Sequence, residues 1–276
     1  MLGSIIGDTA GSVYEFNNIK TMDFPFFSEK SDYTDDSIMT MAVADWLLKD
    51  PTHGMDTLEA SLISFAKKYP CPMGGYGGMF FRWLFRSDGK REPYNSWGNG
   101  SAMRASANGW MFDTLEETER VAGLSAAITH NHPEGIKGAQ STAAAIFMAR
   151  NGSSKEEIRS YITEKYGYNL NRTCDEIRPV YGWDGSCQGT VPEAMVAFFD
   201  STDFESAIRL AVSLGGDSDT LACITGGIAE AFYKEIPAPI AKGIWSLLPE
   251  DFKAILKEME ARTSYRLPEL FSSCER

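Results

Sequence analysis

Several features that define other protein classes are scarce in this chain of 276 residues. Its five cysteines, Cys71, Cys174, Cys187, Cys223 and Cys274, are odd in number and none forms a Cys-x-x-Cys pair. This pattern argues against a disulfide framework and a thiolate metal site, and it fits a reducing compartment. No apolar run approaches the length of a bilayer span, and Asp8 interrupts the apolar start of the chain. We therefore expect a soluble, unexported, cytoplasmic protein without a membrane partner.

The chain also lacks an excess of basic residues. It has 26 lysines and arginines against 38 acidic residues, which gives a net charge of −12. A surface of this sign repels polyanions, so broad nucleic-acid binding is not expected, although a local pocket can still hold one phosphate group.

Alternating β-branched patterns, which are typical of strands, are almost absent. Apolar residues instead recur at helical spacing, for example Leu58, Leu62 and Phe65, and glycines and prolines separate these segments at ordinary connection lengths. The pattern predicts an all-α protein of about ten to twelve helices. Because no Ser/Gly-rich linker, charge block or repeat divides the chain, we expect a single domain over residues 1–276, for which a monomer is plausible.

The first expected helix carries a stripe of glycines. Gly3, Gly7 and Gly11 recur every four residues and therefore share one helix face, which predicts close approach of a second helix. Glu15 continues this stripe, so we expect its side chain to emerge where the packed groove opens. An alternative is a glutamate at an interface, satisfied by backbone amides.

Two acidic clusters stand far apart in the sequence, Thr34-Asp35-Asp36 and Asp217-Ser218-Asp219-Thr220. Each alone is explained by helix capping, because threonine and aspartate are good N-caps and acids complement the helix dipole. Capping needs only one acceptor per helix, however, and four carboxylates packed together repel one another strongly without a cation. The doubling therefore favours a site for Mg²⁺ or Mn²⁺, whose preferred ligands are oxygens, over Zn²⁺.

A glycine-containing loop, Tyr94 to Arg104, runs into a segment of small residues. Its glycines allow close backbone approach to a ligand, and a following helix terminus offers free amides to a phosphate or diphosphate. An ordinary capped turn is the alternative. Arg104 is either a phosphate partner or a structural arginine.

His130 and His132 are two of three histidines in the chain. Residues two apart do not share a helix face, so a joint zinc site is not expected, and at most one of the pair should touch a ligand. The alternative is a polar turn at a helix end before Pro133.

Five motifs in order resemble the ADP-ribosylglycohydrolase family over nearly the whole chain. They are Gly7-Asp8-Thr9-Ala10-Gly11 with Tyr14-Glu15-Phe16, Thr34-Asp35-Asp36-Ser37, Gly98-Asn99-Gly100-Ser101-Ala102-Met103-Arg104, Thr129-His130, and Gly216-Asp217-Ser218-Asp219-Thr220. The resemblance implies an orthogonal all-α bundle with two Mg²⁺ or Mn²⁺ ions at the base of an ADP-ribose cleft.

The resemblance also implies roles for individual residues. Thr34, Asp35, Asp36 and Asp219 would hold one metal, and Asp217, Asp219 and Thr220 the other, so that Asp219 bridges. Glu15 would lie beside the metals and position ribose or water or act as base, with Asp35 and Asp36 as alternatives for proton transfer. The substrate-binding residues would be Ser96, Trp97, Gly98, Asn99, Gly100, Ser101 and His130.

The expected activity is metal-dependent hydrolysis of the N- or O-glycosidic bond between ADP-ribose and a protein side chain or small molecule. Two alternatives remain. One is a noncatalytic ADP-ribose-binding or crystallin-like structural protein, which would be marked by lost metal ligands. The other is a divalent-metal phosphohydrolase that attacks the diphosphate of a nucleotide.

Overall fold

The computed structural model of this chain describes residues 1–89 and 91–271, and these residues confirm the all-α class. They contain no β-strand, only two isolated bridges, Thr34 to Met73 and Gly98 to Ser186. Both bridges hold loops that reach the site described below.

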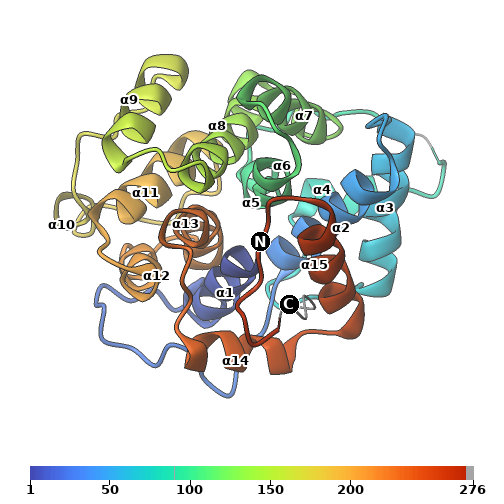
Figure 1. The fold of residues 1–276 in the computed structure, drawn as a ribbon. Helices are drawn as coiled ribbons and strands as arrows, with labels where there is room; N and C mark the ends of the chain where they lie inside the picture. Colours follow the sequence, from blue (N-terminus) through green and yellow to red (C-terminus); the bar gives the residue numbers. More distant parts are fainter. Residues whose placement is uncertain (90, 272–276) are drawn as a thin grey trace.

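Helices follow one another with short connections (Figure 1). In chain order they are α1 (Leu2–Gly11), the 3-10 turn η1 (Ser12–Tyr14), α2 (Asp35–Lys49), α3 (Met55–Lys68), α4 (Gly78–Leu84), α5 (Gly100–Met103), α6 (Ser106–Met111), α7 (Leu115–Ala127), α8 (Pro133–Arg150), α9 (Lys155–Tyr166), α10 (Cys174–Ile177), α11 (Cys187–Asp200), α12 (Phe204–Ser213), α13 (Ser218–Tyr233), α14 (Ala238–Leu247) and α15 (Glu250–Arg262). The described residues form more helices than the expected ten to twelve, because loops rich in small residues also wind into short ones such as α5 and α10.

Helix α13 is the centre of the molecule. Nearly all of its residues are buried, and α1, α8, α11 and α12 pack around it (Figure 1). A helix that is enclosed on every side needs apolar or small residues all round, which explains the run from Leu221 to Ala231.

Helix α1 lies against α13, as the glycine stripe predicted. A Cβ on Gly3, Gly7 or Gly11 would fall 2.3, 1.9 or 2.4 Å from a backbone oxygen of α13. Any side chain would therefore push the two helices apart. The stripe thus brings the end of α1, with Glu15 just beyond it, against the start of α13.

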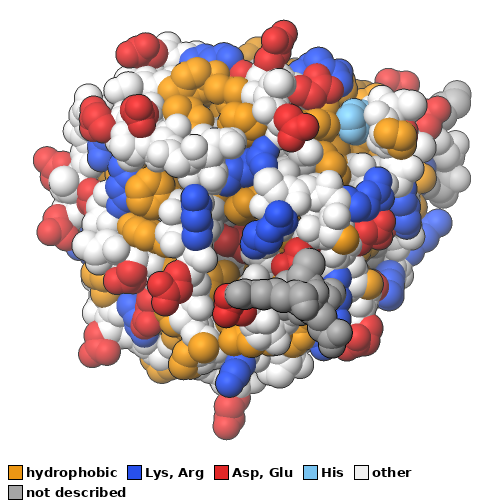
Figure 2. All heavy atoms as spheres, viewed as in Figure 1, with side chains coloured by type: hydrophobic (Ala, Val, Ile, Leu, Met, Phe, Trp, Pro, Cys, Tyr) orange, Lys and Arg blue, Asp and Glu red, His pale blue; other side chains and the backbone are white. Residues whose placement is uncertain are grey.

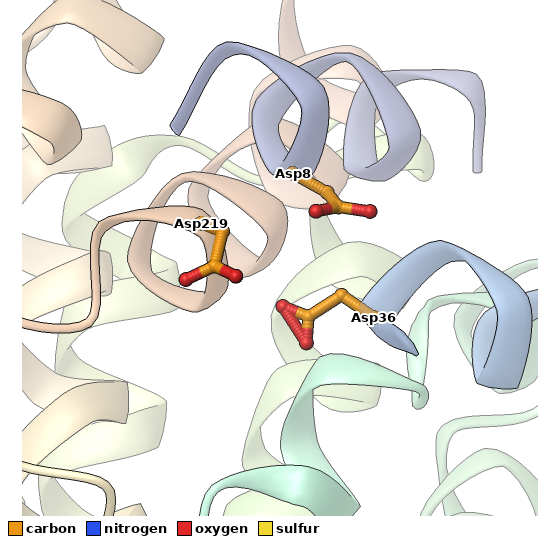
Figure 3. Close-up of side chains that lie close together, drawn as sticks. All are labelled: Asp8, Asp36 and Asp219. Atoms are coloured by element: carbon orange, nitrogen blue, oxygen red, sulfur yellow. The ribbon is translucent and has the colours of Figure 1, made fainter. Parts of the chain in front are cut away.

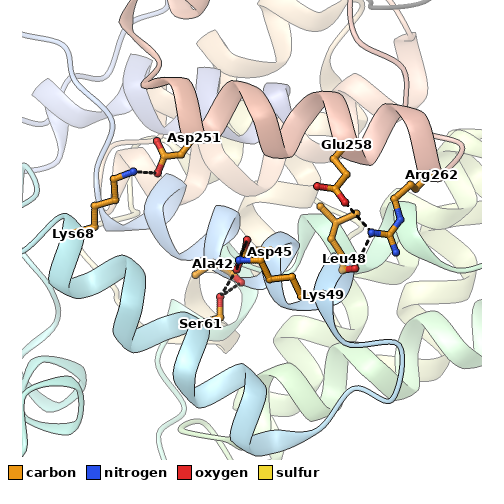
Figure 4. A network of polar contacts seen from close by, with 9 residues as sticks. All are labelled: Ala42, Asp45, Leu48, Lys49, Ser61, Lys68, Asp251, Glu258 and Arg262. Carbon is orange, nitrogen blue, oxygen red and sulfur yellow. Dashed lines mark hydrogen bonds and ion pairs between the residues drawn. The ribbon is translucent and has the colours of Figure 1, made fainter.

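Helix α2 is held by polar contacts with α3 and α15 (Figure 4). Ser61 of α3 donates to the Ala42 carbonyl at 2.7 Å, and Arg262 of α15 donates to the Leu48 carbonyl at 2.8 Å. Lys68 and Asp251 join α3 to α15 at 2.6 Å. An exposed ion pair of this kind contributes at most about 1 kcal/mol, so α2 is held mainly by the two hydrogen bonds to its carbonyls.

Lys and Arg side chains lie among Asp and Glu side chains on the face drawn in Figure 2. Cys71, Cys174, Cys187 and Cys223 are free thiols, whereas Cys274 lies outside the described residues. Among the helices described, none combines the length and the apolar character needed to cross a membrane.

Candidate functional site

The first acids of α2 and α13 lie at the base of a cleft of about 520 Å³. Glu15, the glycine loop 74–78 and the loop 94–100 line it as well. Trp183 stands at its wall with 62% of its surface exposed. Segments from distant parts of the sequence therefore share one concave site.

Three of the four carboxylates predicted from the two clusters converge, and Asp8 and Glu15 join them. Oxygens of Asp8, Asp36 and Asp219 lie within 4.8 Å of one another, and the three side chains point together from α1, α2 and α13 (Figure 3). Oxygens of Glu15, Asp217 and Asp219 form a second group with the same spacing. Asp219 belongs to both groups, which is the geometry that a bridging carboxylate requires.

The start of α2 is built on Asp8. Thr34 caps the helix by accepting from the Asp36 amide at 3.2 Å, and its hydroxyl donates to Asp8 Oδ1 at 2.8 Å. The Asp8 Oδ2 atom accepts from the amides of Thr34 and Ser37 and from the Ser37 hydroxyl. Asp8 is completely buried. It therefore ties α1 to the first turn of α2 and fixes the direction of Asp36.

The start of α13 follows a turn that only glycine accommodates easily. Gly215 and Gly216 both have φ of +73°, in the left-handed region. Asn18 makes two hydrogen bonds to this turn. Its Oδ1 accepts from the Gly216 amide at 2.7 Å, and its Nδ2 donates to the Gly216 carbonyl at 2.9 Å. The same Nδ2 donates to the Glu15 carbonyl. Asn18 thereby joins the Glu15 turn to the Asp217 turn.

Neighbouring polar groups orient individual carboxylates. The Thr220 hydroxyl donates to Asp36 Oδ1 at 2.9 Å, which links the two clusters directly. Asn99 Nδ2 donates to Asp217 Oδ2 at 2.7 Å and to Thr190 Oγ1 at 3.0 Å. Both amide protons of Asn99 are thus engaged by the protein, and its side chain positions Asp217.

Five carboxyl groups of the site have raised pKa values. Burial raises the pKa of Asp8 to about 6, although its hydrogen bonds oppose the shift. Burial, followed by the charges of Asp217 and Asp8, raises the pKa of Glu15 to about 7. Burial and neighbouring carboxylates also raise the pKa values of Asp35, Asp36 and Asp219 well above the usual range. Without a cation, these closely packed carboxyl groups therefore keep protons at pH values where exposed ones are ionised.

This donor set fits a hard divalent cation. All ligand atoms offered are oxygens, as Mg²⁺ and Mn²⁺ prefer. Asp219 Oδ1 is buried and has no hydrogen-bond partner among the described residues, which is rare for a carboxylate oxygen. Asp35 lies outside both carboxylate groups but lines the cleft.

The predicted substrate loop is only partly in the cleft. Ser96, Gly98, Asn99 and Gly100 line it. Trp97 is not part of the lining and its ring instead meets that of His132, with centroids 5.6 Å apart.

Ser101 and Arg104 serve the packing of this loop. Ser101 is fully buried outside the lining, and its hydroxyl donates to the Gly135 carbonyl at 2.7 Å. Arg104 lines the cleft although its surface is fully buried, and its guanidinium donates to the Ser125 carbonyl at 3.0 Å. Arg104 thus combines a structural hydrogen bond with a position in the cleft lining.

The two histidines separate, as expected from their spacing. His130 lines the cleft and is 5% exposed. His132 caps α8, because its Nδ1 accepts from the Glu134 amide at 3.1 Å. Burial and the charge of Arg104 lower the pKa of His130 well below its usual range, so its ring is neutral at pH 7.

Sequence reasoning missed three contributors to the site. Asp8 was recognised only as a break in the apolar start of the chain and as part of a motif, although it is the single charged residue of α1, which was the available signal. Trp183 had no distinguishing pattern in the sequence. The loop 74–78 was taken only as a breaker, yet a Cβ on Gly74 would lie 2.8 Å from Glu15 Oε2.

The fold and the cleft together define an all-α protein with a carboxylate centre at the base of a polar pocket. A family model for ADP-ribosylglycohydrolases matches residues 1–266, and the chain belongs to this family.

Characterised relatives match over most of the chain. ADP-ribosylarginine hydrolase Tri1 of Pseudomonas putida (strain GB-1) is 25% identical over 272 residues, covering 89% of this chain and 73% of that protein. Human ADP-ribosylhydrolase ARH3 is 26% identical over 310 residues, covering 84% of each. A solved structure titled ADP-ribosylglycohydrolase-related protein complex has a TM-score of 0.75 at 21% identity, covers 95% of both chains and confirms the fold.

Proposed function

We propose that this protein is a metal-dependent hydrolase that cleaves the N- or O-glycosidic bond between ADP-ribose and an acceptor and releases ADP-ribose. The observation that carries the proposal is the pair of carboxylate groups that share Asp219 at the base of the cleft. The presence of every predicted carboxylate speaks against a noncatalytic relative.

Two Mg²⁺ or Mn²⁺ ions fit this centre. Thr34, Asp35, Asp36 and Asp219 would hold one, and Asp217, Asp219 and Thr220 the other. Thr34 Oγ1 accepts one hydrogen bond, from Asp36, and so keeps a lone pair for a cation. When bound, such ions supply a Lewis acid for the ribose hydroxyls and lower the pKa of a coordinated water.

Asp8 belongs to the first carboxylate group by distance, but its hydrogen bonds suit a different role. Its two oxygens already accept from two amides and two hydroxyls of Thr34 and Ser37. We therefore assign Asp8 to orienting the ligands of α2 rather than to holding a cation.

The remaining chemistry belongs to side chains at the cleft. Glu15, with a pKa near neutrality, can hold or release a proton at the working pH and so orients the attacking water or accepts its proton. Asp35 is the alternative base. The nearby carboxylates stabilise the positive charge that develops on the ribose as the glycosidic bond breaks.

The other end of the cleft would bind the nucleotide half of ADP-ribose. Gly98 and Gly100 line the cleft beside His130 without side chains of their own, which suits close contact of their backbone with a diphosphate or ribose oxygen. The acceptor would be a modified protein or a small molecule. Because Tri1 carries the name ADP-ribosylarginine hydrolase, ADP-ribosylarginine is the first substrate to test.

Mass spectrometry of ADP-ribose released from a panel of modified proteins and small molecules tests the proposal. Release should require Mg²⁺ or Mn²⁺, stop with EDTA and resume when the metal is restored. Asp36→Asn should abolish release, whereas Asp56→Asn, on the exposed face of α3, is the matched control and should not. Release that is indifferent to EDTA would reject the metal-dependent mechanism.

The same experiment separates the alternatives. A phosphohydrolase would convert free ADP-ribose to AMP, whereas a glycohydrolase leaves it intact. A protein that only binds the mark would retain ADP-ribose affinity and release nothing from any substrate in the panel.

A further inference from the structure

A chain of hydrogen bonds runs from the buried guanidinium of Arg104 to the imidazole of His130. Arg104 NH2 donates to Thr129 Oγ1 at 2.9 Å, and Thr129 Oγ1 lies 2.7 Å from His130 Nδ1. All three residues are at least nine-tenths buried. These hydrogen bonds to His130 are therefore shielded from bulk water.

The chemistry of Arg104 gives this chain a direction. A guanidinium has only donors, so Thr129 oxygen must accept at that end. The Thr129 hydroxyl then has one proton of its own to donate, and His130 Nδ1 lies 2.7 Å from its oxygen. Bonds aligned head to tail in this way strengthen one another.

The opposite arrangement places a proton on Nδ1 and is electrostatically unfavourable. Its N–H dipole would point toward the positive end of the chain, where Arg104 already directs an N–H at the same oxygen. The charge of Arg104 is felt at His130, whose ring it helps to keep neutral. A lone pair on Nδ1 faces this charge favourably, so the ring proton belongs on Nε2.

The Nε2 atom faces the loop that lines the cleft. A Cβ on Gly100 would lie 3.2 Å from it, and a Cβ on Gly98 would lie 3.5 Å away. Because both positions are glycine, the space between this nitrogen and the cleft stays open. Tyr94 borders the ring on another side, with centroids 5.9 Å apart.

We infer that Arg104, acting through Thr129, locks His130 as the neutral Nε2–H tautomer, so that His130 offers one fixed hydrogen-bond donor to an oxygen of the bound ligand. Arg104 and Thr129 are positioning residues in this arrangement. The assignment of that oxygen to ADP-ribose rests on the proposed function, whereas the tautomer itself does not. An anionic oxygen then meets a donor whose strength stays constant across neutral pH.

The tautomer can be measured directly in the free, Mg²⁺-loaded protein. With ¹⁵N-labelled histidine, long-range ¹H–¹⁵N correlation spectra distinguish a protonated from an unprotonated ring nitrogen, and His53→Gln and His132→Gln assign the other two rings. The expected spectrum of His130 shows unprotonated Nδ1 and protonated Nε2 at pH 7. A protonated Nδ1, in a neutral or a charged ring, overturns the inference.

Variants of Thr129 test the relay without removing the buried arginine. Thr129→Val deletes the hydroxyl at constant shape and should mix the two tautomers, while Thr129→Ser should retain the wild-type spectrum. Thr142→Val is the matched control, since the Thr142 hydroxyl is equally buried and has no partner within the described part of the chain. A wild-type His130 spectrum in Thr129→Val refutes the relay.

Calorimetric titration with ADP-ribose measures the consequence for binding. Thr129→Val should weaken binding about tenfold, which corresponds to one hydrogen bond, and Thr129→Ser should restore it. Undiminished affinity in Thr129→Val overturns the donor role of His130. If the wild-type protein fails to bind ADP-ribose, the proposed function fails, and the tautomer is then decided by the spectrum alone.

Discussion

Gly11→Ala, which adds one methyl group outside the site, should strongly reduce the activity of the site. Gly11 is the last residue of α1, and a Cβ there would lie 2.4 Å from the Ser218 carbonyl oxygen and 2.6 Å from the Asp219 Cα. Ordinary contact begins near 3.4 Å, so Gly11→Ala requires α1 and α13 to separate by about 1 Å. Both atoms belong to the backbone and cannot rotate away.

The energetic cost follows from this geometry. Overpacking of a closed interior costs about 1–3 kcal/mol, and contact with backbone places this case near the upper end. Alanine recovers up to about 1 kcal/mol through its better helix propensity. The expected net loss of unfolding free energy is about 2 kcal/mol, which leaves a domain with a typical stability of about 5–15 kcal/mol folded.

The effect on activity should exceed the effect on stability. Asp8 and Glu15 move with α1, whereas Asp217 and Asp219 belong to α13, so the separation opens both carboxylate groups. A displacement of about 1 Å in a catalytic site can cost about 100-fold in rate, and we expect a loss of that size in ADP-ribose release.

Two assays check this prediction. Urea denaturation gives the change in unfolding free energy, and mass spectrometry of released ADP-ribose gives the rate. Gly182→Ala is the control, because a Cβ there would meet nothing within 4 Å. Wild-type stability together with a wild-type rate in Gly11→Ala would show that close α1–α13 packing does not position the carboxylates.

Three further predictions follow from the same contacts. Asp219→Asn should abolish turnover and Mg²⁺-induced stabilisation, and it should raise the metal-free unfolding free energy because it removes one of the mutually repelling carboxylates. Thermal unfolding with and without Mg²⁺ measures both effects, and persistent Mg²⁺ stabilisation would contradict the bridging role. In EDTA, Glu15 should contribute about 1 kcal/mol, after allowance for solvent screening, to the fall in wild-type stability as pH rises from 4.5 through 7, because folded Glu15 keeps a proton that the unfolded chain releases. Glu15→Gln should reduce this loss, and an unchanged pH dependence in that variant would argue against the raised pKa. Asn18→Ala should lower turnover about 10-fold by freeing the Gly216 turn, unlike Asn151→Ala, which removes one hydrogen bond at the end of α8; equal rates would dismiss Asn18 as a positioning residue.

Local signals in the sequence were sufficient for several features. Thr34 and the acids after it mark a helix start whether or not a metal is present, and the paired glycines before Asp217 mark a turn for backbone reasons alone. The stripe Gly3, Gly7, Gly11 correctly predicted a close helix partner, because side-chain size along one helix face is written in the sequence itself.

Other features have no local signature. Asp8 looks like any isolated acid until the first turn of α2 supplies four donors to it. Asn99 was expected at the ligand, but its amide is engaged by Asp217 and Thr190. No sequence pattern marks Trp183, which lies at the cleft wall only because the segment before α11 folds there.

Helical periodicity, small-residue spacing and capping are properties of neighbouring residues, and so the chain alone established the all-α class, the helix starts and the chemical kinds of ligand available. Which oxygens meet, which donor each amide serves and which nitrogen of His130 faces the cleft depend on contacts between residues as far apart as Asp36 and Thr220. Such contacts form only when packing brings the helices together, because hydrogen bonds and carboxylate interactions act over a few ångströms in space regardless of separation along the chain.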